Sequence, residues 1–275
     1  MRRKHAYSCG MNLLEEIIEA KRARIELAKQ VIPEARLREA AIEIRGYAKN
    51  HALLEALSNG DRINIIAEFK RRSPSKGTIR ENADAATIAR SYQSAGAAAI
   101  SVLTEENYFA GSLNDLRAVR EVVSLPILRK DFIFDEYQVY ESAAARTDAL
   151  LLIVAALDDE TLARLLYLTE DELGMDALVE VHTKEEMDRA VAIGAKLIGV
   201  NNRNLLTFEV STETSIELAR FAPADAVLVS ESGLTPDEVP RLKAVGYQGF
   251  LVGEALMRAE DPVQQLRVFR GESQD

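Results

Sequence analysis

The sequence predicts an α/β protein, a single (β/α)8 TIM barrel with an N-terminal helical extension. Eight short apolar runs follow residue 61, and stretches with helical periodicity separate them. The runs are apolar throughout, as in parallel strands that are buried on both faces. Eight strand–helix units in about 200 residues fit the size of a barrel, whereas an open doubly wound sheet more often has about five or six strands.

The chain before the barrel is expected to be helical. Leu13, Ile17 and Ile25 recur at helical spacing, Pro33 interrupts the pattern, and a second helix is expected over 35–58. No strand-like run occurs in this part of the sequence. We therefore expect a helical extension that packs against the barrel.

The expected strands share a β-branched, apolar composition and lie at 63–69, 97–103, 126–130, 149–155, 177–181, 197–201, 226–231 and 249–253. The expected helices between them include 83–96, 113–123, 158–173, 184–194 and 236–246. Several of these helices begin with Asp, Ser or Thr, and the last two end in Gly, which are the usual start and stop signals.

Three segments are expected. Residues 1–10 form an upstream extension without a catalytic role, residues 11–60 form the helical extension, and residues 61–275 form the barrel. The basic N-terminus is followed by a charged amphipathic stretch rather than an apolar one, which argues against a cleaved secretory signal.

Composition excludes several classes of function. The 275 residues carry a net charge of −10, which argues against a nucleic-acid partner. No apolar run is long enough to cross a membrane. Cys9 is the single cysteine, so an intramolecular disulfide cannot form and a cytoplasmic location is favoured. The absence of a Walker loop and of a GxGxxG motif disfavours nucleotide hydrolysis and NAD binding.

Polar and ionisable side chains gather at the carboxyl ends of six of the eight expected strands. In TIM barrels this end carries the active site. Lysines and glutamates in such a ring are costly to bury unless they pair, and mutual pairing shifts their pKa values in the way that acid–base catalysis needs. The residues concerned are Glu68, Lys70, Arg129, Lys130, Asp131, Glu180, His182, Asn201, Asn202, Arg203, Ser230, Glu231, Ser232, Gly233, Gly253 and Glu254.

A phosphate site is expected after the last two strands. Ser232–Gly233 and Gly253–Glu254 offer unhindered backbone N–H groups where barrels commonly hold phosphate. The loop RRSPSKG at 71–77 adds a hydroxyl group and local positive charge.

Metal and nucleophile chemistry are disfavoured. The three histidines show no metal-ligand spacing, and no Ser–His–acid combination stands out. His182 is expected to have a structural role on the strand face opposite Glu180.

The sequence resembles the indole-3-glycerol-phosphate synthase family of tryptophan biosynthesis. The likeness covers the whole barrel and the helical extension from Met11, and it leaves residues 1–10 without a counterpart. It rests on IIAEFKRRSPSKG (65–77), LTEENYFAGS (103–112), ILRKDFIFDEYQVYE (127–141), LVEVHTKEE (178–186), IGVNNRNLLTFEV (198–210), SESGL (230–234) and FLVGEALMR (250–258).

The resemblance implies a carboxy-lyase that needs no metal and no organic cofactor. Its substrate is 1-(2-carboxyphenylamino)-1-deoxyribulose 5-phosphate, and its products are indole-3-glycerol phosphate, CO2 and water. The expected partner is thus a phosphorylated small molecule, and neither a nucleic acid nor a membrane. A monomer is expected, with a homodimer as the alternative.

The resemblance also implies catalytic roles. Lys130 is the principal general acid at the substrate ketone. Lys70 binds the substrate carboxylate, and a second role as an acid in the dehydration stays open. Glu180 is the main base or the carboxylate that stabilises a cation. Glu68 and Glu231 orient the lysines and bind substrate hydroxyls.

Binding roles follow from the same resemblance. Asn201 holds Glu180 or the substrate, and Arg203 contacts the anthranilate carboxylate or stacks on its ring. The phosphate is held by Ser73, Ser232, Gly233, Gly253 and the backbone N–H of Glu254. Glu254 stands where some members have Ser, so its carboxylate is expected to point away from the phosphate. The apolar walls are Phe109, Phe132 and Leu205. The N-terminal helices are expected to cover the top of the barrel as a lid.

Two alternatives remain. A phosphoribosylanthranilate isomerase-like enzyme is disfavoured, because that activity needs a Cys/Asp pair and Cys9 is the only cysteine. A non-catalytic phosphosugar-binding protein is disfavoured because the polar strand ends are retained.

Overall fold

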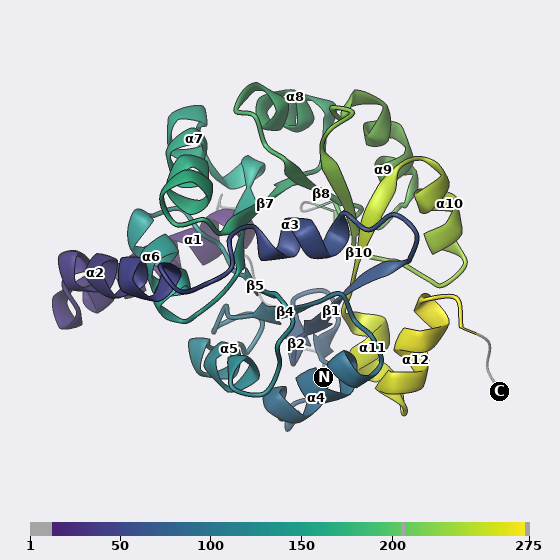
Figure 1. Ribbon diagram of the computed structural model, residues 1–275, viewed down its shortest axis with the longest axis horizontal. Helices are drawn as coiled ribbons and strands as arrows, with labels where there is room; N and C mark the ends of the chain where they lie inside the picture. The colour runs from purple at the N-terminus through teal and green to yellow at the C-terminus, as the bar shows by residue number, and fades with distance from the viewer. Residues whose placement is uncertain (1–12, 205–206, 273–275) are drawn as a thin grey trace, which may run out of the picture.

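A computed structural model describes residues 13–204 and 207–272 (Figure 1). The predictions for residues 1–10 and for Leu205 lie outside these residues.

A closed barrel of eight parallel strands forms the centre of the protein, in the order β1-β10-β9-β8-β7-β6-β5-β4 (Figure 1). The eight expected strands are confirmed, with small changes at their ends. Their bounds are β1 Asn64–Phe69, β4 Ala99–Leu103, β5 Ile127–Lys130, β6 Ala149–Ile153, β7 Asp176–Val181, β8 Leu197–Asn201, β9 Val227–Glu231 and β10 Tyr247–Val252.

Helices surround the barrel on its outer side (Figure 1). Side chains of Asp84, Ser112, Asp158 and Thr183 each accept a backbone N–H at the start of a helix, as the sequence predicts. The expected helix over 158–173 is shorter, because α7 passes into a π-helical turn at Leu168–Glu172. The helix bounds are α4 Ala85–Ser94, α5 Leu113–Arg120, α6 Glu136–Ala144, α7 Asp159–Tyr167, α8 Lys184–Ala192, α9 Glu213–Leu218, α10 Glu238–Ala244, α11 Glu254–Arg258 and α12 Pro262–Phe269.

The strand period of two sorts side chains between the barrel interior and the helix layer. Ile66, Leu128, Leu178 and Val229 belong to the cluster that fills the interior. Their strand neighbours, such as Ile65, belong to the cluster under the helices. Two residues further along each of these four strands, the interior position carries an ionisable side chain, namely Glu68, Lys130, Glu180 and Glu231. The top layer of the interior is therefore polar.

The expectation of one helix over 35–58 is wrong. The chain forms α2 Glu34–Arg45 and α3 Ala52–Leu57 after α1 Leu13–Val31. The Arg45 guanidinium is buried and donates to the carbonyl oxygens of Leu173 and Gly174, both at 2.8 Å. These long-range bonds fix the end of α2, so the chain turns there and does not continue as a helix.

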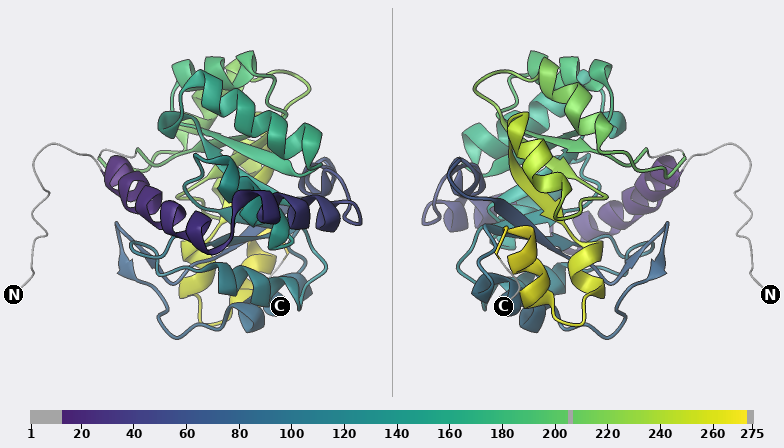
Figure 2. Two further views of the ribbon diagram at one scale, coloured as in Figure 1. Left: turned by 90° about the vertical axis from the view of Figure 1, so that its left-hand side faces the viewer. Right: turned by 90° about the vertical axis from the view of Figure 1, so that its right-hand side faces the viewer.

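The helical extension reaches both ends of the barrel (Figures 1 and 2). The backbone N–H groups of Leu53 and Leu54 donate to Asp176 Oδ2 at 2.8 and 3.0 Å, and Asp176 is the first residue of β7. Leu53 and Leu57 are fully buried in the interior cluster. Helix α3 thus closes the amino-terminal end of the barrel, and the expectation that the N-terminal helices all cover the top is wrong for it.

Within the described ranges, no helix is long and apolar enough to cross a membrane.

Candidate functional site

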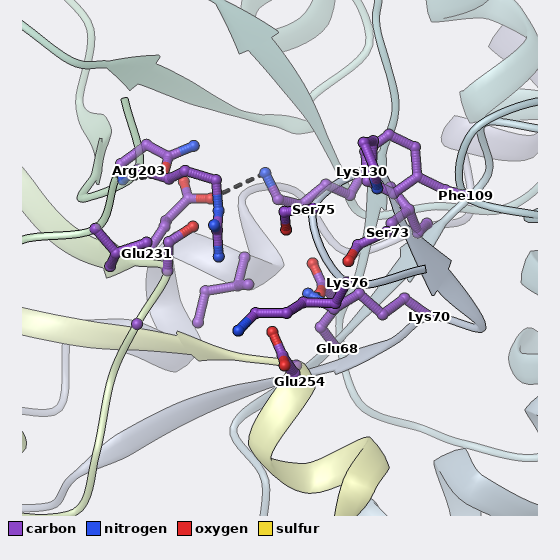
Figure 3. Close-up of a pocket in the computed structure, with 18 of the residues that line it drawn as sticks. Glu68, Lys70, Ser73, Ser75, Lys76, Phe109, Lys130, Arg203, Glu231 and Glu254 are labelled. Atoms are coloured by element: carbon purple, nitrogen blue, oxygen red, sulfur yellow. Dashed lines mark hydrogen bonds and ion pairs between the residues drawn. The ribbon is translucent and has the colours of Figure 1, made fainter. Parts of the chain in front are cut away.

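A cavity of about 840 Å³ lies at the carboxyl ends of the strands (Figure 3). It contains all of the predicted site residues that the structure describes. They are Lys130, Lys70, Glu180, Glu68, Glu231, Asn201, Ser73, Arg203, Ser232, Gly233, Gly253, Glu254, Phe109 and Phe132. Of the strand-end residues expected from the sequence, most line this cavity, whereas Arg129, His182, Asn202 and Ser230 do not.

Lys130 is held between two carboxylates from other strands. Its Nζ atom lies 3.0 Å from Glu180 Oε2 and 2.9 Å from Glu231 Oε2 (Figure 3). All three side chains project from the polar top layer of β5, β7 and β9. This arrangement places a cation at the floor of the cavity between two groups that can exchange protons with it.

These contacts shift the pKa values of the three groups in different directions. Burial opposes the charge of Lys130, but the carboxylates of Glu180 and Glu231 raise its pKa above the ordinary value. Burial also opposes ionisation of Glu180, yet the positive charges of Lys130 and His182 lower its pKa to about 2. For Glu231 burial prevails over Lys130, and repulsion by Glu180 adds to it, so that its pKa rises to about 7. At neutral pH the site thus holds one carboxylate that stays ionised, Glu180, and one that titrates near pH 7, Glu231.

A second lysine–glutamate pair lies beside the first. Lys70 Nζ lies 2.5 Å from Glu68 Oε1, both from the end of β1. A Cβ atom added to Gly253 would lie 2.1 Å from the same Glu68 oxygen. Glycine at the end of β10 is therefore what leaves room for this ion pair.

Asn201 and His182 both contact Glu180. The Asn201 side chain helps to lower the pKa of Glu180. His182 Nε2 lies 3.4 Å from Glu180 Oε1, and its Nδ1 atom lies 3.1 Å from Glu186 Oε2. The expectation that His182 faces away from Glu180 is wrong, because residues two apart on a strand share one face.

The corner that is expected to bind phosphate contains tight backbone turns at Ser232 and Gly233. Ser232 and Gly233 have φ angles of 68° and 71°, and a Cβ atom on Gly233 would lie 2.1 Å from Val210 Cγ1. The buried Ser73 hydroxyl has no hydrogen-bond partner among the described residues, so it is free for a ligand.

The direction of the Glu254 side chain differs from the expected one. Its side chain projects into the cavity from the start of α11 (Figure 3). Its Oε1 atom lies 3.0 Å from Arg258 Nε, one helical turn further. The ion pair partly offsets the negative charge of this carboxylate.

Apolar groups cover one side of the cavity. The Phe109 and Phe132 rings lie 6.2 Å apart between centroids, at an angle of 39°. Leu14 and Ile17 of α1 complete this wall, and the sequence reasoning did not single them out as site residues. Helix α1 therefore lies over the top of the barrel, at the same end as the loop after β1 (Figure 2).

The loop after β1 contains a small hairpin that the sequence reasoning did not predict, with β2 Arg72–Ser73 paired to β3 Gly77–Thr78. Its turn carries Lys76, which lines the cavity (Figure 3). The basic motif at 71–77 was the available signal for this residue.

Two cationic side chains of the cavity, Lys76 and Arg203, have no carboxylate partner among the described residues, whereas the others do. Lys70, Lys130 and Arg258 each have a carboxylate within 3.0 Å. Over residues 13–204 and 207–272, no carboxylate lies within 4.0 Å of Lys76 or of the Arg203 guanidinium, whose Nη1 donates to the Phe208 carbonyl oxygen at 3.2 Å. These two cations are available for an anionic ligand.

The described part of the chain contains no group of three or more His, Cys, Asp or Glu residues placed to hold a metal ion.

Comparison with known proteins gives a consistent result. A family model described as "Indole-3-glycerol phosphate synthase" matches residues 14–269. The chain is 48% identical over 265 residues to a Micrococcus luteus protein of that name, covering 96% of this chain and 98% of the relative. It is 46% identical over 260 residues to a Carboxydothermus hydrogenoformans protein of that name, covering 93% and 98%.

Among solved structures, thiamine phosphate pyrophosphorylase from Pyrococcus furiosus superposes with a TM-score of 0.58 at 16% identity. The match covers 77% of this chain and 96% of that one, and at this identity it supports the barrel fold alone.

Proposed function

The chain belongs to the indole-3-glycerol phosphate synthase family, and we propose how its cavity performs the reaction of that family. The substrate is 1-(2-carboxyphenylamino)-1-deoxyribulose 5-phosphate, and the products are indole-3-glycerol phosphate, CO2 and water. The observation that carries the residue assignment is the position of Lys130 between Glu180 and Glu231 at the cavity floor.

Ring closure needs an acid at the ketone. The aromatic carbon that bears the carboxylate attacks the ketone carbon, and the ketone oxygen must gain a proton or a stabilising cation. Lys130 supplies that proton, because its carboxylate neighbours keep it in the charged form until the substrate is bound. Loss of CO2 then restores the aromatic ring.

Dehydration needs an acid and a base together. The hydroxyl left by the former ketone departs as water after protonation, and a proton leaves the neighbouring ring carbon. Glu180 stays ionised at neutral pH and is suited to accept that proton or to stabilise the developing cation. Lys70 is placed beside Glu68 to protonate the leaving hydroxyl or to bind the substrate carboxylate.

The two anionic ends of the substrate need separate partners. The phosphate fits the corner formed by Ser73, Ser232, Gly233 and Gly253 together with the backbone N–H of Glu254. The anthranilate ring fits against the wall that Phe109 and Phe132 form, and the Arg203 guanidinium, which has no carboxylate partner among the described residues, is available for the substrate carboxylate. Leu205, expected in the same wall, stays a prediction.

A direct assay tests the proposal. The chain should convert the carboxyphenylamino-deoxyribulose phosphate into an indole, seen as a rise in fluorescence. Lys130→Met should lower kcat by roughly 10²- to 10⁴-fold, the range for loss of a general acid. Lys196→Met, at the amino-terminal end of β8, serves as a control and should keep wild-type turnover. Turnover of Lys130→Met close to wild type would remove the central assignment.

We also propose that the chain is divided into a helical extension at residues 11–60 and a barrel at residues 61–275. The cytoplasmic location and the monomeric state expected from the sequence stay predictions.

A further inference from the structure

A lysine interrupts the buried apolar stripe of α1. Ile17, Lys21 and Ile25 are spaced by four residues and are exposed by 2%, 3% and 2%. The Lys21 Nζ atom lies 2.7 Å from Asp131 Oδ1 and 3.2 Å from Glu106 Oε2. Helix α1 is thus joined to the barrel by a charged contact at a position where an apolar residue would be ordinary.

Asp131 is the centre of this contact. Its Oδ1 atom also accepts the backbone N–H of Phe132 at 2.8 Å, and its Oδ2 atom accepts from Thr104 Oγ1 at 2.7 Å and from Arg129 Nη2 at 3.0 Å. The carboxylate is fully buried, and burial alone would raise its pKa, but Lys21 and Arg129 lower that pKa to about 2. Asp131 therefore remains charged and fixes the chain where β5 ends.

The two neighbours of Asp131 both line the cavity. Lys130, the last residue of β5, precedes it, and Phe132 follows it. Ile17 lies one helical turn before Lys21 and also lines the cavity. The contact between Lys21 and Asp131 thus joins the cover of the cavity to the segment that carries the proposed acid.

Stability alone does not account for this contact. A buried ion pair is often no more stabilising than well-packed apolar residues of similar volume. Helix α1 also has a second tether, because Lys29 Nζ lies 2.8 Å from Asp135 Oδ2 in a partly exposed position outside the cavity.

We propose that Lys21 is a positioning residue for the reaction, which acts through Asp131 and couples the docking of α1 over the cavity to the placement of Lys130. This inference rests on the proposed function. When α1 is docked, Lys21 neutralises Asp131, and the end of β5 holds Lys130 toward Glu180 and Glu231. Without that cation, a buried carboxylate loses one of its two positive partners and the strand end relaxes.

The experiment compares two lysines of the same helix. Lys21→Met and Lys21→Gln are measured beside Lys29→Met, for kcat, KM and thermal unfolding. Both Lys21 variants should lower kcat by roughly 10- to 100-fold, the loss expected when a reacting group is displaced by about 1 Å. Their KM should change by less than about threefold, because Lys21 does not touch the substrate. Lys29→Met should keep kcat within about twofold of wild type.

A double variant tests the route through Asp131. If Lys21 acts through this carboxylate, Lys21→Met combined with Asp131→Asn should lower kcat no further than the more severe single variant. Additive losses would overturn the coupling.

Other outcomes also overturn the inference. A kcat of the Lys21 variants equal to that of Lys29→Met, or a loss confined to KM, would remove the positioning role. Failure of both Lys21 variants to fold would make Lys21 a structural residue. A wild-type chain that forms no indole would instead refute the proposed function, so the two failures are distinguishable.

Discussion

Gly199 of β8 leaves the space that the Glu231 carboxylate of β9 occupies. A Cβ atom at position 199 would lie 2.3 Å from Glu231 Oε1, which is closer than real side chains approach. Both residues belong to interior positions of neighbouring strands, so the glycine determines where this carboxylate meets Lys130.

Gly199→Ala should therefore lower kcat by displacing Glu231. We expect a loss of roughly 10-fold or more, with a smaller change in KM, because a shift of about 1 Å at a reacting group has effects of this size. Steady-state kinetics checks this, and Gly194→Ala in the loop after α8 is a matched control without a close neighbour, although its φ of 79° adds backbone strain. Unchanged kcat in Gly199→Ala would mean that Glu231 can move without consequence.

The pKa of Glu231 predicts the pH dependence. A carboxyl with a raised pKa of about 7 is protonated below that pH and ionised above it. Since the ionised form is the one that pairs with Lys130, kcat/KM should rise as the pH increases through about 7. This rise of kcat/KM with pH should be absent in the Glu231→Gln variant. If it persists there, it belongs to the substrate phosphate or to another group.

Lys76 should contribute to substrate binding and not to the chemical steps. Lys76→Ala is expected to raise KM by about tenfold, which corresponds to about 1.4 kcal/mol, and to change kcat little. Lys196→Ala removes a lysine at the opposite end of the barrel and should leave KM unchanged. A fall in kcat at constant KM would instead place Lys76 in the chemistry.

Glu170 should destabilise the fold at alkaline pH. Burial raises its pKa from 4.5 to about 7, so the folded state holds this proton more tightly than the unfolded state does. Its contribution to stability is full below about pH 4.5 and is lost as the pH rises through about 7. The substitution Glu170→Gln should therefore change the free energy of unfolding more favourably at pH 8 than at pH 4. The difference between the two effects should be at most about 3 kcal/mol. Urea unfolding at the two pH values measures this, and an equal effect at both would contradict the shift.

The barrel and the gathering of ionisable side chains at one end of it could be predicted because they depend on local patterns. Each strand is a buried apolar run, and the alternation along it places Glu68, Lys130, Glu180 and Glu231 on the interior side. The same alternation places His182 beside Glu180, so the strand period itself contains the signal for this contact.

Long-range contacts left weaker signals. The position of α3 depends on Asp176, and the end of α2 depends on the carbonyl groups of Leu173 and Gly174. Periodicity within residues 35–58 contains no information about these partners. The partner of Lys21 was equally hidden, although a lysine in an apolar helical stripe is itself a sign of a buried counter-charge.

The extension that reaches both ends of the barrel has a consequence for synthesis. Its anchoring contacts join residues far apart in the chain: Lys29 to Asp135 across 106 positions, Leu53 to Asp176 across 123 and Arg45 to Leu173 across 128. The partners of the extension are therefore translated well after it, from Glu106 to Asp176. During that interval the apolar stripe of α1 is exposed to solvent. Correct folding of the nascent chain therefore requires that this stripe does not bind other apolar surfaces before α6 and β7 are synthesised.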